Sequence, residues 1–155
     1  MARIKTSVVI RSPQDETFDY LTDPRNAKEW STELVDVTYD GDLAEGTTGV
    51  DTRKMGRRQI RMPWTVTAYE RSDRIVFEYG RPFPATAEFS FQSADEGGTL
   101  VRCDTHLRPR GLWRVLAPLI AAEAKKVDAV QFQKAKGILE ARSAKRASDE
   151  EGSMT

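Results

Sequence analysis

The sequence predicts an α+β fold in which a single antiparallel sheet is covered on one face by a long C-terminal helix. From residue 34 onward, apolar and polar residues alternate in six successive segments, the period of half-buried strands. Short turns rich in Gly, Asp and Pro separate these segments, and connections this short join antiparallel neighbours. From residue 112 the period becomes helical, so a helix is available to cover the apolar face of the sheet.

The chain begins with a strand and two short helices. Residues 4–10 alternate and are rich in β-branched side chains, which is typical of a strand. The segment SPQDE (12–16) has the composition of a helix start, so a helix is predicted over 13–21. Asp-Pro at 23–24 ends it and begins a second helix over 24–30. Helices this short have little surface to bury alone, so we expect three side chains to anchor them: Phe18, Leu21 and Trp30.

Six further strands complete a predicted seven-stranded sheet, at 34–40, 47–55, 58–70, 73–80, 85–92 and 98–108. Parity separates an apolar from a polar face in each strand. The apolar side chains of the third to fifth of these strands are Ile60, Met62, Trp64, Val66 and Ala68, then Ile75, Phe77 and Tyr79, then Ala87, Phe89 and Phe91 in the fifth. Pro63 cannot donate to a strand ladder, so a bulge or an edge is expected there.

The covering helix is predicted over 112–142. Its sheet-facing stripe, projected at 100° per residue, consists of Leu116, Ile120, Val127, Val130 and Ile138. Pro118 interrupts the pattern, and a proline inside a helix costs about 3 kcal/mol. Residues 143–155 are small or charged and have no apolar period, so we expect a single domain over 1–142 followed by a disordered tail.

Composition excludes several classes of function. The chain has 24 Lys and Arg and 24 Asp and Glu, so its zero net charge argues against a general attraction to nucleic acid or anionic membrane, although a local patch can persist. The single cysteine, Cys103, excludes an internal disulfide and a cysteine metal cluster, and we expect neither a metal nor a cofactor. No apolar run is long enough for a signal peptide or a membrane-spanning helix, so a cytoplasmic protein is expected.

Four stretches narrow the fold further: FDYLTDPRNAKEW (18–30), GRRQIRMPWTVTAYE (56–70), GGTLVRCDTHLRPRG (97–111) and VLAPLIAA (115–122). Because it holds these four stretches in this order, the chain resembles the START-domain and birch-pollen-allergen-like superfamily (SRPBCC). Within that superfamily it resembles the bacterial polyketide cyclase/dehydrase and lipid-transport group. The resemblance covers residues 3 to about 142. It implies the helix-grip fold, in which a curved sheet wraps around the long helix and leaves an apolar cavity between them. Two interpretations of Pro118 follow. Either the break lets the first turns act as a gate, or Pro118 starts the main helix after a lead-in turn.

We expect this cavity to be the functional site. Its predicted lining is Trp64, Phe77, Tyr79, Phe89, Thr105, Val127 and Gln131, with Phe83 at the mouth. Inward hydroxyl groups are expected on Thr48, Thr52, Tyr79 and Thr105. A mainly apolar pocket with a few polar groups suits a small hydrophobic ligand.

Glu123 is the acid–base candidate, because it falls within the helix stripe, where burial would raise the pKa of its carboxyl. Tyr79 is its predicted catalytic partner. The alternative is that Pro118 shifts the phase of the helix and Glu123 reaches solvent. His106 falls on the polar face of its strand and Cys103 on the apolar face, so neither is expected to act as a nucleophile.

Three functions remain open. The leading expectation is a carrier or sensor that binds a lipid, polyketide or isoprenoid-like molecule. The second is a polyketide cyclase, aromatase or dehydratase acting in the same cavity. The third is an interaction module using the basic hairpin RKMGRRQIR (53–61), although no aromatic residue is interleaved there and no nucleic-acid partner is expected. A homodimer is left open as a further partnership.

Overall fold

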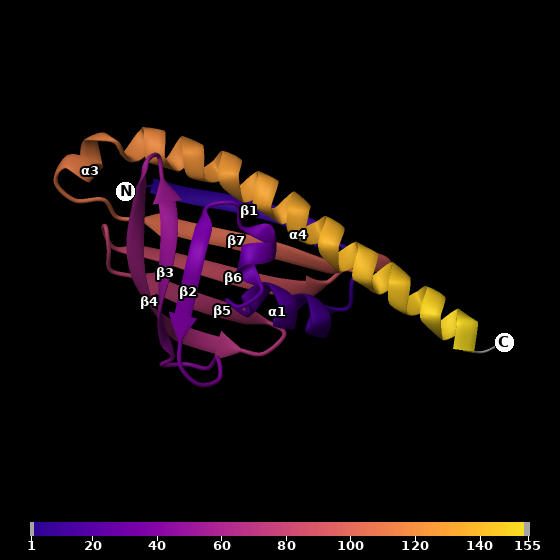
Figure 1. Cartoon of the computed structure of the whole chain (residues 1–155). Coiled ribbons are helices and arrows are strands. Elements are labelled where there is room, and N and C mark those ends of the chain that lie inside the picture. Colours follow the sequence, from indigo (N-terminus) through magenta and orange to yellow (C-terminus); the bar gives the residue numbers. More distant parts are fainter. Residues whose placement is uncertain (1, 154–155) are drawn as a thin grey trace.

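The computed structural model describes residues 2–153 as a curved sheet with helices on one side (Figure 1). The elements are, in chain order, β1 (Ala2–Ile10), α1 (Gln14–Thr22), α2 (Ala27–Trp30), β2 (Leu34–Tyr39), β3 (Thr48–Met55), β4 (Arg58–Glu70), β5 (Arg74–Tyr79), β6 (Ala85–Ser93), η1 (Asp95–Gly97), β7 (Thr99–Leu107), α3 (Leu112–Val115) and α4 (Ala117–Ser153). The predicted strands are confirmed to within two residues at each end. The alternation of apolar and polar residues therefore determined them well.

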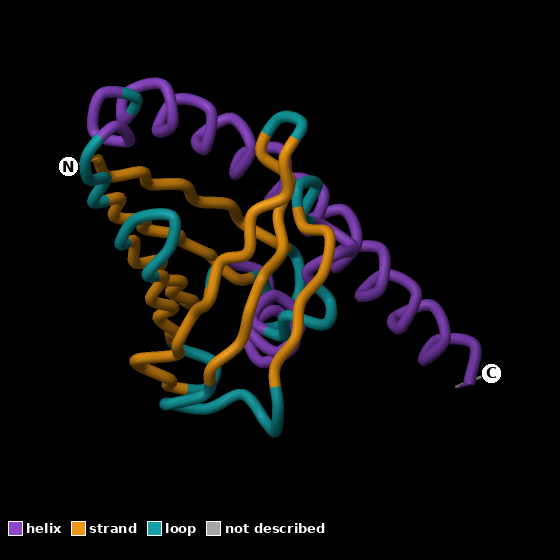
Figure 2. The backbone as a smooth tube through the Cα atoms, turned by 60° about the vertical axis from the view of Figure 1, so that its left-hand side comes forward, coloured by secondary structure: helices purple, strands orange, loops and turns teal. Residues whose placement is uncertain are grey.

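The sheet has seven antiparallel strands in the order β1-β7-β6-β5-β4-β3-β2. The first strand pairs with the last, with Ala2 opposite Leu107, and the two edge strands, β1 and β2, are joined through α1 and α2. Figure 2 shows β2, β3 and β4 running steeply across the direction of β1, so that the sheet curves around a concave face. Helix α4 lies along β1 on this face (Figure 1). This is the predicted helix-grip arrangement.

The two short helices plug the concave face as expected. Phe18 is fully buried, where its ring meets the edges of Tyr69 and Phe91. Trp30, at the end of α2, stacks on Phe132 of α4 with ring centroids 6.3 Å apart. These aromatic contacts join both helices to the sheet and to α4 in one core.

One irregularity of the sheet lies elsewhere than predicted. Pro63 stays in register opposite Val50, and the bulge in β4 falls between Val66 and Ala68 instead. An antiparallel ladder alternates hydrogen-bonded and non-hydrogen-bonded pairs, and a proline fits the second type without a bulge.

The helix break follows the second interpretation of Pro118. Helix α3 ends at Val115, Leu116 is a turn, and α4 begins at Ala117, which places Pro118 in the first turn, where its missing N–H has no helical acceptor to lose. The predicted stripe was correct in part. Leu116 and Val130 are exposed, whereas Ile120, Val127 and Ile138 are half-buried. The α4 side chains that are buried belong to Ala117, Gln131, Phe132, Ala135 and Leu139.

The C-terminal region also differs from the expected disordered tail. Helix α4 continues to Ser153, and residues 154–155 lie outside the described part. Arg142 stands over the ring of Tyr20, 4.7 Å from its centroid, and its guanidinium pairs with Glu29 at 3.4 Å. One turn later, Arg146 pairs with Glu16 of α1. The helix thus continues past the predicted end at residue 142, where Arg146 pairs with α1.

Candidate functional site

A small cavity lies between the two short helices and the concave face of the sheet. Its volume is about 60 Å³, and its lining is Leu21, Thr22, Pro24, Ala27, Trp30, Leu34, Val37, Asp51, Arg53, Trp64, Phe77, Tyr79 and Phe89. The ring of Trp64 meets Phe77 edge-on at 5.3 Å, and Phe77 meets Phe89 edge-on at 6.3 Å, so one wall is aromatic. The cavity as it stands has room for a few water-sized groups.

A buried ion pair forms the polar side of the cavity. Asp51 of β3, only 5% exposed, accepts a hydrogen bond from Trp64 Nε1 at 2.8 Å through Oδ1. Its Oδ2 accepts from the Arg53 guanidinium at 3.0 Å. Burial opposes the charge on Arg53, but Tyr79 and Asp51 outweigh this cost and raise the pKa of the guanidinium. Both acceptor oxygens of Asp51 are therefore occupied, and Arg53 is a permanent cation beside the cavity.

Tyr79 and Asp128 interact with this pair electrostatically, and Cys103 interacts with Tyr79 and Asp128. Burial, reinforced by the charge of Asp51, raises the pKa of the Tyr79 phenol, so it stays protonated. Burial also raises the pKa of the Asp128 carboxyl of α4 to about 6; Arg53 lowers it and Glu33 raises it. The thiol of Cys103 lies 3.6 Å from Thr105 Oγ1, and burial raises its pKa to about 12. Cys103 is therefore no thiolate nucleophile at neutral pH.

An unpaired donor lies on the opposite wall of the cavity. Trp30 is 7% exposed, and its Nε1–H has no hydrogen-bond partner among the described residues. A buried donor without an acceptor costs about 1–3 kcal/mol, so such groups are rare unless something satisfies them. Arg53, Tyr79 and Trp30 thus give the lining three residues with donor groups, and each oxygen of Asp51 already accepts a hydrogen bond.

The predicted site residues divide into two groups. Trp64, Phe77, Tyr79 and Phe89 line the cavity, and Glu123, Thr105, Val127, Gln131 and Phe83 are not among its lining residues. Glu123 is exposed, which is the alternative that the sequence left open; Val127 is half-buried and Gln131 is buried. Phe83 belongs to a second apolar cluster, where its ring lies 5.7 Å from that of Trp113. Thr48 is exposed, so its hydroxyl does not face inward.

Sequence reasoning missed Asp51, Arg53 and Asp128. Arg53 is the first residue of the basic hairpin (53–61), and Asp51 lies two residues before it. The pairing of β3 with β4 would have placed both residues. Gly49 is opposite Trp64, Asp51 opposite Met62, and Arg53 opposite Ile60. Directly paired residues share a face of the sheet, so the inward positions of β4 place these residues of β3 inward as well.

Gly49 is required by the same pairing. A Cβ atom at this position would lie 2.3 Å from Cζ2 of Trp64, so the indole ring rests directly on the bare backbone of β3. The close approach lets Nε1 reach Asp51 two residues further along the strand.

Neither a metal-binding cluster nor a membrane-spanning helix is found in the part of the chain that the structure describes. Residues 2–153 hold no group of three His, Cys, Asp or Glu side chains able to bind a metal ion. Within the same residues, no helix combines the length and the apolar character needed to cross a bilayer.

Comparison with known structures shows the same fold in several bacterial proteins. TTHA0849 from Thermus thermophilus superposes with a TM-score of 0.77 at 11% identity, covering 92% of this chain and 99% of that one. A START superfamily protein from Mycobacterium smegmatis gives a TM-score of 0.73 at 12% identity, covering 89% and 97%. The Aha1 dimer from Colwellia psychrerythraea gives 0.65 at 17% identity, covering 90% and 97%.

No curated protein sequence matches this chain. The model of the family described as polyketide cyclase / dehydrase and lipid transport matches residues 1–139, nearly the whole of the strand and helix arrangement described above. The chain therefore belongs to the polyketide cyclase / dehydrase and lipid transport family.

Proposed function

We propose that this protein is a carrier or sensor that binds a small, mainly hydrophobic molecule bearing keto, carboxylate or similar acceptor oxygens. The observation that carries the proposal is the unpaired Nε1–H of Trp30, a residue that lines an aromatic cavity together with Arg53 and Tyr79. Unused donors in an apolar enclosure are satisfied best by a ligand that supplies acceptors. Membership of the family supports the same class of ligand.

The ligand enters by widening the cavity, because about 60 Å³ is well below the ~300–1,000 Å³ of ordinary ligand pockets. The mobile wall in this proposal is α2 together with β2. Helix α2 is a single turn without a side-chain cap, and β2 is an edge strand that is nowhere fully buried. Both can move outward while β4, β5 and β6 keep their ladders on either side.

The proposal is tested by native mass spectrometry of the purified protein and by titration with 8-anilinonaphthalene-1-sulfonate, an apolar dye with an acidic group. Ala27 lines the cavity and Ala121 packs in the separate cluster around Phe83, so they form a matched pair. We expect Ala27→Leu to fill the cavity and weaken dye binding about tenfold or more, and Ala121→Leu to leave it unchanged. Equal binding by the wild type and both variants would refute a ligand site in this cavity.

A second function, acid–base catalysis on a poly-β-keto chain, is favoured by one observation: burial raises the pKa of the Asp128 carboxyl to about 6, although Arg53 lowers it. Asp128 belongs to α4 and is not among the lining residues of the cavity, so this function requires the widened cavity to reach it. In this proposal the Asp128 carboxylate takes a proton from a methylene carbon between two keto groups. The resulting enolate carbon attacks a keto carbon of the same chain, and the new alkoxide takes the phenolic proton of Tyr79. A carboxyl with a pKa near 6 is well matched to proton transfer close to neutral pH.

The two functions are separated with a synthetic poly-β-keto thioester. Asp128→Asn is expected to abolish cyclisation and keep dye binding, whereas Glu123→Gln, which changes an exposed carboxyl on the same helix, is expected to change neither. Absence of any cyclised product with the wild-type protein would leave the carrier function alone.

A further inference from the structure

The tip of the molecule at α3 presents large apolar side chains to solvent. Leu112 is 86% exposed, Val115 78%, Leu116 45% and Leu119 71%. Figure 1 shows α3 projecting at the end of the molecule opposite the C-terminus, beyond the strands. Exposed apolar residues are ordinary when scattered, but four within eight positions at a projecting tip indicate a contact surface.

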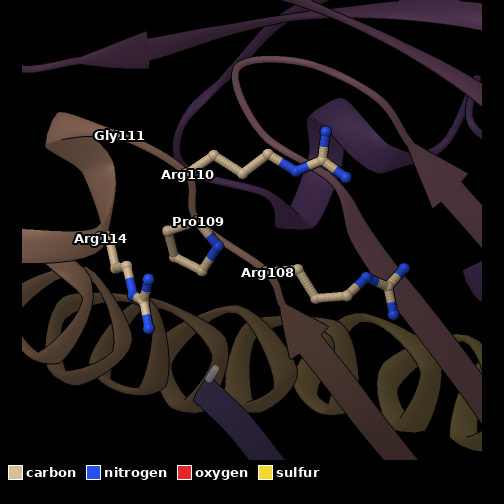
Figure 3. Close-up of a pocket in the computed structure, with 5 residues that line it drawn as sticks. All are labelled: Arg108, Pro109, Arg110, Gly111 and Arg114. Carbon is tan, nitrogen blue, oxygen red and sulfur yellow. The ribbon is translucent and has the colours of Figure 1, made fainter.

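Three arginines belong to the same segment of the chain, Arg108 and Arg110 just before α3 and Arg114 within it. Arg108, Arg110 and Arg114 line an open hollow of about 410 Å³ together with Pro109 and Gly111 (Figure 3). Among residues 2–153 none of the three forms an ion pair, and the Arg108 guanidinium donates to the Thr86 hydroxyl at 2.8 Å. The segment RPRGLWRVLAPL (108–119) holds no acidic residue. A strongly cationic patch therefore persists in a chain of zero net charge.

The tip is mounted firmly on the sheet. The Arg108 backbone N–H donates to the Pro84 carbonyl at 2.9 Å, and Trp113 packs its ring at 5.7 Å from that of Phe83. Gly111 has φ = 60°, a conformation that favours glycine, and this residue turns the chain from β7 into α3. The apolar side chains are thus held outward instead of folding back onto the core.

We propose that this tip docks the protein on an anionic lipid surface. The apolar side chains of α3 and the start of α4 enter the boundary between headgroups and acyl chains. The guanidinium groups of the arginines reach the lipid phosphates, while the aliphatic parts of these side chains lie against apolar groups. Charge complementarity selects this occupant. Two copies of the tip meeting face to face would bring six unpaired arginines together, which disfavours a dimer through this surface.

Vesicle flotation tests the apolar part of the tip. The full chain is mixed with vesicles of phosphatidylcholine alone or of phosphatidylcholine with phosphatidylglycerol. We expect it to float with the anionic vesicles at low salt and to be released as salt is raised. Leu112→Ser combined with Leu119→Ser should abolish flotation. Val9→Ser combined with Val130→Ser, which alters exposed apolar residues elsewhere, should not.

The contribution of the arginines is tested with a second pair of variants. Arg110→Gln combined with Arg114→Gln should weaken binding to anionic vesicles by about 30-fold, since each basic residue near such a surface contributes about fivefold. Arg57→Gln combined with Arg58→Gln, on the exposed β3–β4 hairpin, should leave binding nearly unchanged. Thermal unfolding should be the same for all four variants, because every altered side chain is exposed.

Three results would overturn the proposal. The first is wild-type protein that stays with the soluble fraction beside anionic vesicles at low salt. The second is flotation that survives in the Leu112 and Leu119 variant. The third is light scattering that shows a dimer which this variant converts to a monomer, because a second copy would then cover the tip. Dye binding in the cavity is independent of these outcomes, so the lipid surface and the ligand site can fail separately.

Discussion

Trp64 Nε1 donates a hydrogen bond to Asp51 Oδ1 at 2.8 Å, joining β4 to β3 beneath the cavity. The same carboxylate holds the Arg53 guanidinium at 3.0 Å through its other oxygen. One buried side chain thus fixes the position of an aromatic wall and of the cation next to it.

Replacing Asp51 should be strongly destabilising. Asp51→Ala leaves both the Trp64 N–H and the Arg53 cation without a partner, and loss of one member of a buried pair costs about 3–5 kcal/mol. Arg53 is partly exposed, so we expect about 2–4 kcal/mol, measured by urea unfolding. Asp51→Asn keeps an acceptor for Trp64 and should lose less. Equal stability of both variants and the wild type would show that the pair contributes nothing.

Gly49→Ala should disturb Trp64. The added Cβ would fall inside the indole ring, which cannot move away because Asp51 and the edge contact with Phe77 hold it. Overpacking of this kind costs about 1–3 kcal/mol. Gly80→Ala is the control, since a Cβ there meets no atom within 4 Å. The melting temperature and the Trp fluorescence should change in the first variant only.

Asp128 should make stability depend on pH. Its folded pKa of about 6 lies above the ordinary aspartate value of 3.8, so the folded state binds the proton more tightly than the unfolded chain. Stability from this group is present below pH 4 and is lost as the pH rises through about 6. Asp128→Asn should therefore be more stable than the wild type at pH 8, by about 1–2 kcal/mol after solvent screening. A difference that does not shrink between pH 7 and pH 4 would contradict this assignment.

Two variants of Trp30 separate its contribution to packing from its contribution to ligand binding. Trp30→Ala removes the stack on Phe132 and should cost about 3–5 kcal/mol, as is typical of a buried large aromatic residue. Trp30→Phe keeps a ring there and removes only the unpaired N–H, so its melting temperature should stay close to that of the wild type. If the N–H recognises the ligand, dye or ligand affinity should still fall. Unchanged affinity in Trp30→Phe would assign Trp30 to packing alone.

The end of α4 should contribute little to stability. Truncation after Arg142 keeps its contact with Tyr20 and its pair with Glu29, and removes the exposed pair between Arg146 and Glu16. Such pairs are worth about 0–1 kcal/mol, so calorimetry should show a shift of at most a few degrees. A large loss would mean that the last turns of the helix are part of the core.

The strands and the aromatic wall could be predicted because side chains of a strand alternate strictly. Once Trp64 was placed inward, Phe77, Tyr79 and Phe89 followed by parity, and all four line the cavity. The period of two also tolerates errors in strand ends, since moving a boundary leaves the faces unchanged.

The buried face of α4 could not be predicted from the helical period alone, because the period fixes only the angles between residues. The stripe predicted around Leu116 includes Glu123, whereas in the structure Glu123 is exposed and Asp128 is half-buried. Packing of α4 against β1 and α2 decides which face is covered. The inward position of Asp51 and Arg53 follows only from the pairing of β3 with β4.

The pairing of β1 with β7 constrains the order in which the protein can assemble on the ribosome. Residues 2–10 emerge first, yet their hydrogen-bonding partners, Thr99–Leu107, emerge after every other strand. The hairpins from β2 to β7 can form as they appear, because each strand pairs with its sequence neighbour. The N-terminal strand must wait as an unpaired apolar segment, and α4 can dock along it only after β7 has joined it to the sheet. Pairing of β1 with β7, followed by docking of α4, is therefore the last stage of folding.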